Sequence, residues 1–147
     1  KLFDLVETSA VKHFAVAADA HDAIVLNQHG LLKMLALHID FAVEKYGPLF
    51  EKDSMFPDRV NAEFAYVIGR TEIEMRVWER GAGETLACGT GTCATAVAAI
   101  LNGLADNDLT VHLLGGDLKI SWSGNEADSV FMTGPAEYAF TGEIDYN

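Results

Sequence analysis

Apolar and polar residues alternate regularly across residues 72–77, where Ile73, Met75 and Val77 are separated by charged side chains. A period of two residues places successive side chains on opposite faces of a strand, so this segment is predicted to be a half-buried β-strand. The β-prone residues 64–68 precede it, and Gly69-Arg70-Thr71 lies between the two. The pattern predicts two antiparallel strands joined by a tight turn.

Two segments show helical patterns instead. Apolar residues recur at helical spacing between residues 31 and 46, and Gly47-Pro48 is predicted to end that helix. Residues 92–101 are almost wholly small or apolar and are followed by Asn102-Gly103, which is a typical C-terminal stop. The positions at helical spacing in the first segment are Leu31, Leu35, Ile39, Ala42, Val43 and Tyr46.

The remaining apolar runs are short and predict further strands at residues 14–18, 23–26, 129–133 and 138–141. Residues 110–114 and 118–122 flank Gly115-Gly116-Asp117 and predict a β-hairpin. We expect an α+β fold in which a mostly antiparallel curved sheet or barrel wraps around the central small-residue helix. The alanines at 94, 96, 98 and 99 would let the strands approach that helix closely.

Composition narrows the class of protein. The 147 residues are 50% hydrophobic, which predicts a single folded domain over residues 1–147. The formal charge of −12 disfavours nucleic acid as a partner. No apolar run approaches the roughly 20 residues of a membrane span, so no membrane association is expected. Two cysteines make no disulfide framework, and a reactive thiol would need a reducing compartment, so we expect a cytoplasmic protein.

Chemistry is concentrated in the loop that precedes the second predicted helix, where Cys88 is followed by Gly89-Thr90-Gly91. Unpaired backbone N–H groups and the positive end of the helix dipole converge at such a position. They stabilise a thiolate, which makes Cys88 a candidate reactive group, and they can also hold a carboxylate. The same residues have a simpler interpretation, in which a cysteine before a helix is a small buried side chain.

Residues 76–94, RVWERGAGETLACGTGTCA, closely resemble the second-cysteine motif of the diaminopimelate epimerase family. Gly47-Pro48, residues 56–64 and residues 130–137 resemble further family segments, so that the similarity extends from about Ala18 to the end. The resemblance implies the family's fold and a cofactor-independent isomerase of lysine and peptidoglycan biosynthesis. Enzymes of this family convert LL- to meso-diaminopimelate with two thiols that act as acid and base.

That family has two similar halves facing each other across a cleft, and each half supplies one cysteine. The first half's cysteine motif has no counterpart in this sequence. The resemblance therefore implies that residues 1–147 are the C-terminal half, which is inactive alone and has the N-terminal half as its partner. The uncovered face of such a half could also pair with a second copy as a homodimer.

Roles for individual residues follow from the resemblance. Cys88 would be one of the two catalytic thiols. Gly89 and Thr90 would donate backbone N–H groups to the substrate α-carboxylate, and Arg80 would meet a carboxylate with its planar guanidinium. The resemblance also gives substrate contacts to Glu79, through the ammonium group, and to Asn61 and His21.

The clearest departure from the family is Asp19, in the segment Ala18-Asp19-Ala20-His21. The family has a substrate-contacting asparagine there, and an additional negative charge would repel a carboxylate. An alternative interpretation is therefore a racemase of the same superfamily that acts on another amino acid.

Other interpretations of the same residues remain. The glycines of the loop could cradle a phosphate in a binding module, although the loop lacks the lysine of a phosphate-binding P-loop. The domain could also have a thiol redox or purely structural role.

Individual residues also have simpler interpretations. Cys93 is expected to pack within the helix. Cys88 and Cys93 lack the usual spacing of metal ligands, so no metal site is predicted. Arg80 and Glu79 could merely pair with each other, Asn61 could be a turn residue, and His21 could make only local hydrogen bonds.

Overall fold

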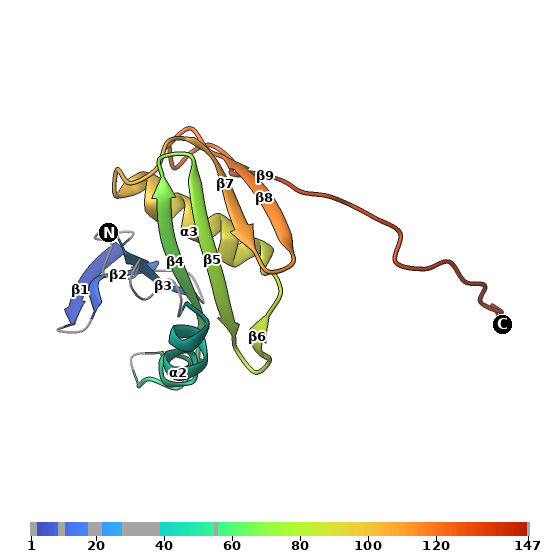
Figure 1. Ribbon diagram of the computed structural model, residues 1–147, viewed down its shortest axis with the longest axis horizontal. Helices are drawn as coiled ribbons and strands as arrows, with labels where there is room; N and C mark the ends of the chain where they lie inside the picture. The colour runs from blue at the N-terminus through green and yellow to red at the C-terminus, as the bar shows by residue number, and fades with distance from the viewer. Residues whose placement is uncertain (1–2, 9–10, 18–21, 28–38, 55, 147) are drawn as a thin grey trace.

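The computed structural model describes residues 3–8, 11–17, 22–27, 39–54 and 56–146. Within these residues the chain forms nine strands and two helices (Figure 1). The strands are β1 (Phe3–Thr8), β2 (Val11–Ala17), β3 (Asp22–Asn27), β4 (Asn61–Gly69), β5 (Glu72–Glu79), β6 (Gly83–Thr85), β7 (Asp108–Leu113), β8 (Gly116–Ser121) and β9 (Phe131–Thr133). The helices are α2 (Ile39–Glu51) and α3 (Gly89–Leu101).

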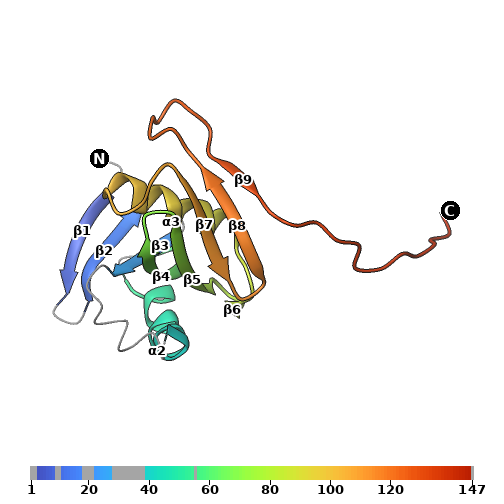
Figure 2. The ribbon, with the colours of Figure 1, turned by 45° about the horizontal axis from the view of Figure 1, so that its top comes forward.

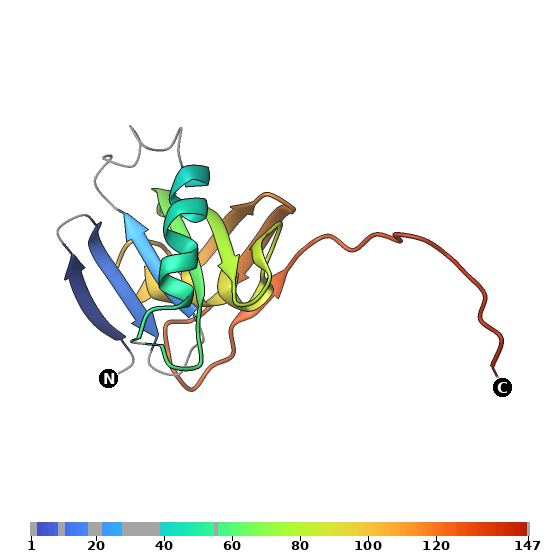
Figure 3. The ribbon, with the colours of Figure 1, turned by 90° about the horizontal axis from the view of Figure 1, so that it is seen from below.

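The strands form one curved sheet in the order β1-β2-β3-β4-β5-β7-β8-β9, with β6 paired to β5 outside this path. Neighbouring strands are antiparallel except for β3–β4 and β5–β7. A parallel pair needs a crossover connection, and α2 and α3 lie in these two connections. Because β4 and β5 run in opposite directions, right-handed crossovers place the two helices on opposite faces of the sheet. Figures 2 and 3 show this arrangement.

Helix α3 lies on the concave face, where it contacts β2, β3, β4, β5, β7 and β8. Its buried residues are all small: Gly91, Thr92, Thr95, Ala96, Ala98 and Ala99. They pack against Ile73, Met75 and Val77 of β5, which are at most 1% exposed. The predicted sheet around a small-residue helix is therefore confirmed, and so is the alternating pattern of the β5 strand.

Helix α2 covers the opposite face of β4 and β5 with a second, smaller core. Val43 packs there with Val60, Ala62 and Phe64. The helix approaches β5 very closely at Gly47, where a Cβ atom would lie 2.5 Å from Cγ of Trp78. Glycine is therefore required at this position by the packing of α2 on the Trp78 ring.

Most of the predicted elements are confirmed. The strand pair joined at Gly69-Arg70-Thr71 is present, with Gly69 paired to Glu72. The hairpin of β7 and β8 is also present, and α3 ends at Leu101, followed by its C-cap Asn102 and by Gly103 in the left-handed region. The helix begins at Gly89, three residues before the predicted start, and strands β1 and β6 were not predicted.

Two predictions were wrong. Helix α2 does not stop at Gly47-Pro48 but continues to Glu51, with Pro48 inside it. Tertiary contacts outweigh the amide that proline lacks, since Phe50 packs against Phe64 and Glu51 is buried. The predicted strand at residues 138–141 is absent, because this segment extends away from the sheet and pairs with no described strand (Figures 1 and 3). Residues 31–38 of the first predicted helical segment lie outside the described residues.

No helix among the described residues has the length and apolar character needed to cross a membrane.

Replacing Gly47 with alanine should destabilise the chain by about 1–3 kcal/mol, because the added methyl group overlaps the Trp78 ring. The better helix propensity of alanine offsets at most about 1 kcal/mol of this cost. The measurement is the free energy of unfolding in urea. Gly69→Ala is the matched control, since a Cβ there meets nothing within 4 Å. Equal stability of both variants would contradict the close approach.

Candidate active site

Cys88 is the N-cap residue of α3 and has an extended backbone, with φ −136° and ψ 110°. Its carbonyl accepts hydrogen bonds from the Thr92 backbone N–H at 2.9 Å and from Thr92 Oγ1 at 2.7 Å. The Cys88 sulfur lies 3.5 Å from Thr90 Oγ1. The thiol is therefore held at the first turn of the helix, beside the N–H groups of Gly89 and Thr90, which have no partner within the helix.

The first turn of α3 also lies close to the beginning of β4. Glu63 is fully buried, and a Cβ at Gly91 would lie 3.0 Å from its Cδ atom. Asn61 lies two residues before Glu63 and therefore on the same face of β4. This contact brings the turn that carries Cys88 to the same end of the sheet as Asn61.

Asn61 and Arg80, which are both predicted to contact the substrate, are in direct contact. Asn61 Oδ1 accepts a hydrogen bond from the Arg80 backbone N–H at 2.8 Å. Arg80 Nη1 donates to the Asp58 carbonyl at 2.9 Å. The predicted alternative in which Arg80 pairs with Glu79 is not what the structure shows, since Glu79 Oε1 accepts from Thr85 Oγ1 across the β5–β6 hairpin.

Glu51 of α2 binds the loop that follows β5, and its role was not predicted from the sequence. Its Oε1 atom accepts from the Gly81 backbone N–H at 3.1 Å and from Arg59 Nη1 at 3.2 Å, while Oε2 accepts from Trp78 Nε1 at 2.8 Å. These interactions, the Trp78 hydrogen bond first among them, lower the pKa of Glu51 despite the opposing effect of burial. Periodicity could indicate only that Gly47 and Glu51 share one face of α2.

Two further segments line the Cys88 loop. Gly115, in the β7–β8 turn, donates its N–H to the Leu86 carbonyl at 2.8 Å. On the other side, Cε of Met132 would lie 3.2 Å from a Cβ at Gly89. Leu86 and Met132 are both exposed, so the surface beside the thiol is partly apolar.

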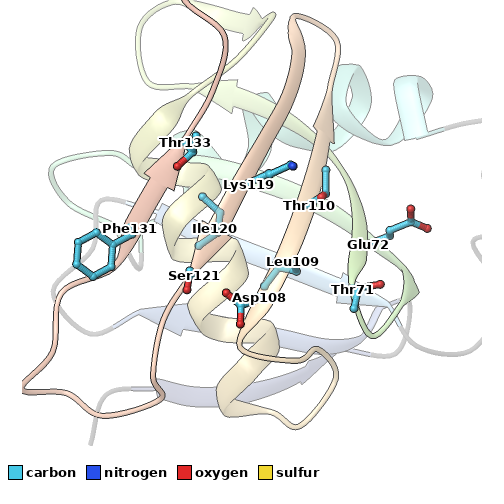
Figure 4. Close-up of a pocket in the computed structure, with 10 residues that line it drawn as sticks. All are labelled: Thr71, Glu72, Asp108, Leu109, Thr110, Lys119, Ile120, Ser121, Phe131 and Thr133. Atoms are coloured by element: carbon cyan, nitrogen blue, oxygen red, sulfur yellow. The ribbon is translucent and has the colours of Figure 1, made fainter.

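A cavity of about 360 Å³ lies elsewhere, on the face of β7 and β8 that points away from α3 (Figure 4). It is an open depression lined by polar side chains such as Asp108, Thr110 and Lys119. None of the predicted site residues that the structure describes lines it. The candidate site is therefore defined by the Cys88 turn and the Arg80 loop.

Of the predicted site residues, Asn61 and Arg80 are hydrogen-bonded, and Glu79 precedes Arg80 in the chain. Cys88, Gly89 and Thr90 form the start of α3, which meets the first residues of β4 through Gly91 and Glu63. His21 and Asp19 lie outside the described residues. The described residues contain no cluster of three or more His, Cys, Asp or Glu side chains that could hold a metal ion. Cys93 packs against the main core, as expected. Burial, followed by electrostatic repulsion from Cys88, raises the pKa of the Cys93 thiol.

Known proteins share the fold and the sequence of this chain. One similar solved structure is a probable proline racemase from Agrobacterium radiobacter K84, with a TM-score of 0.52 and 14% identity over 82% of this chain and 41% of that one. This similarity shows a shared fold. Residues 14–139 match the family model of diaminopimelate epimerase, and the chain belongs to that family.

Sequence relatives carry the same name. Diaminopimelate epimerase from Acetivibrio thermocellus is 59% identical over 107 residues, which are 73% of this chain and 38% of the relative. The enzyme from Agathobacter rectalis is 60% identical over 105 residues, which are 71% of this chain and 36% of the relative. The chain thus spans less than two fifths of the length of these curated relatives.

The two cysteines should differ in reactivity. We expect iodoacetamide to alkylate Cys88 faster than Cys93 at neutral pH, because burial raises the pKa of Cys93 and so reduces its thiolate fraction. Peptide mapping after timed alkylation gives both rates. Faster modification of Cys93 would contradict the assignment of Cys88 as the reactive thiol.

Glu51 should contribute to stability in a pH-dependent way. Its folded-state pKa is lowered from the ordinary value of a glutamate, so its contribution is present above that ordinary pKa and is lost as the pH falls through the folded-state pKa. Glu51→Gln should therefore lower the free energy of unfolding by about 1–3 kcal/mol at neutral pH. The difference from the unmodified chain should shrink in acid. A difference that is independent of pH would show that the carboxylate charge is unimportant.

Proposed function

We propose that this chain supplies one half of the active site of a cofactor-independent diaminopimelate epimerase that interconverts the LL and meso isomers. One observation carries the proposal: the Cys88 thiol lies at the first turn of α3, beside backbone N–H groups suited to a carboxylate. Membership of the diaminopimelate epimerase family supports the reaction and the substrate.

The chemistry requires removal of the proton on the α-carbon of an amino acid. The carbanion that forms is stabilised when its charge spreads onto the α-carboxylate and fixed dipoles face that group. The N–H groups of Gly89 and Thr90 supply such dipoles at the positive end of α3. The Cys88 thiolate takes the α-proton, or its thiol returns one, and a reference pKa of about 8.5 suits a thiol to both roles.

The loop residues would bind the rest of the substrate. Arg80 provides a guanidinium group for a carboxylate, and its backbone is fixed by Asn61. Glu79 provides a carboxylate for an ammonium group. Asn61 and His21 complete the proposed contacts.

Inversion needs an acid on one face of the α-carbon and a base on the other. In the proposal Cys88 acts on one face, and a thiol from an N-terminal half acts on the opposite face. The chain spans only 36–38% of the two relatives described above, which supports a division of the site between two halves. The isolated chain would then be inactive.

A second candidate is a racemase of the same superfamily with another amino-acid substrate. Asp19 favours it, because a carboxylate in place of an amide would repel a substrate carboxylate and attract an ammonium group. The two candidates share the reaction and differ only in substrate.

The test is α-proton exchange in deuterium oxide with LL- and meso-diaminopimelate, under reducing conditions, using the complete protein to which this chain belongs. Exchange with inversion is expected in the complete protein and none in this chain alone. Cys88→Ala should abolish exchange, while Cys93→Ala, the matched control, should retain it. Both variants should keep the circular-dichroism spectrum of the unmodified protein.

Retention of more than about a tenth of kcat in Cys88→Ala, a barrier change below ~1.4 kcal/mol, would overturn the catalytic role. Exchange with another amino acid but not with diaminopimelate would select the racemase. Exchange by this chain alone would disprove the division of the site.

A further inference from the structure

We propose that Glu51 is a positioning residue for Arg80, a role that rests on the proposed function of Arg80 in binding a substrate carboxylate. Glu51 is the last residue of α2 and is only 4% exposed. Its carboxylate accepts a hydrogen bond from the Gly81 backbone N–H, in the loop that carries Arg80.

The carboxylate contacts two segments that are far apart in the sequence, one through a backbone N–H and one through a side chain. Oε1 accepts from the N–H of Gly81, the residue that follows Arg80, and also from Nη1 of Arg59. Arg59 has φ +61°, a left-handed conformation that is uncommon for a residue other than glycine. The Glu51 carboxylate therefore contacts the side chain of a residue whose backbone is already in an uncommon conformation.

The same two stretches provide the groups that hold Arg80. The Asp58 carbonyl, next to Arg59, accepts from Arg80 Nη1 at 2.9 Å, and Asn61 Oδ1 accepts from the Arg80 N–H at 2.8 Å. One carboxylate oxygen thus binds the backbone of the loop after Arg80 and also the side chain of Arg59, which follows the residue whose carbonyl binds the Arg80 guanidinium group. In this proposal Glu51 acts on Arg80 through these neighbours.

The second carboxylate oxygen has a separate structural role. Oε2 accepts from the Trp78 indole at 2.8 Å, and Trp78 is the side chain on which Gly47 of α2 packs. A purely structural interpretation would assign Glu51 only to this docking of α2. The two roles are separable, because Trp78→Phe removes the indole donor while the Oε1 contacts remain.

The first experiment measures amide hydrogen exchange by NMR on this chain, with the Gly81 amide as the reporter and the Val111 amide of β7 as the reference for global opening. Glu51→Gln should accelerate Gly81 exchange relative to Val111 by about tenfold, because the N–H loses its charged acceptor, and Glu51→Asp should accelerate it less, because the charge remains on a shorter side chain. Glu44→Gln, an exposed carboxylate on the same helix, is the matched control and should change neither rate. Trp78→Phe should leave the ratio of the two rates unchanged.

The second experiment measures KM and kcat for diaminopimelate with the same variants in the complete protein. Loss of Arg80 positioning should raise KM about tenfold, which corresponds to ~1.4 kcal/mol, with a smaller change in kcat. Glu51→Asp, which retains the charge, should recover part of the loss that Glu51→Gln causes. Trp78→Phe should alter KM less than Glu51→Gln does.

Unchanged Gly81 exchange in both Glu51 variants would overturn the proposal, whether or not either variant is less stable. Accelerated Gly81 exchange with unchanged KM would also overturn it, because Arg80 would then not depend on the loop for binding. The exchange measurement needs no substrate, so a protein without epimerase activity would refute the proposed function while this result still decides whether Glu51 orders the Arg80 loop.

Discussion

The close packing of α3 inside the curved sheet is the constraint on which the rest of the structure depends. Six strands contact this helix, so the side chains that face them must be small. Larger residues come from the strands instead, with Ile73, Met75 and Val77 filling the space. The helix is thereby fixed along its length, and its first turn, which carries Cys88, is fixed with it.

The site is assembled where this helix begins. Glu63 lies against Gly91, which places the Cys88 turn beside the start of β4, and Asn61 at that start holds the backbone of Arg80. The hairpin of β7 and β8 and the β9 strand close around the same loop through Gly115 and Met132. The Cys88 thiol and the Arg80 guanidinium group thus occupy segments that are each anchored to the sheet, which limits their conformational freedom.

The second helix supports the site from the other face. Gly47 allows α2 to pack on Trp78, and Glu51, one turn later, binds that tryptophan together with the Arg80 loop. A buried carboxylate is costly unless it is hydrogen-bonded, and Glu51 receives three donors from three different segments. Glu51 therefore links the smaller core, through Trp78, to the Arg80 loop of the candidate site, through Gly81.

Local sequence determined much of this protein. The alternation around Met75 identified β5, the turn residues identified two hairpins, and Asn102-Gly103 identified the end of α3, because each signal arises from neighbouring residues. The Cys88 motif likewise identified the candidate thiol and its family. The tertiary structure alone decided that α2 passes through Pro48, that residues 138–141 form no strand in the described chain, and that Glu51 reaches Gly81. These outcomes depend on contacts between residues far apart in the sequence, which no local pattern encodes.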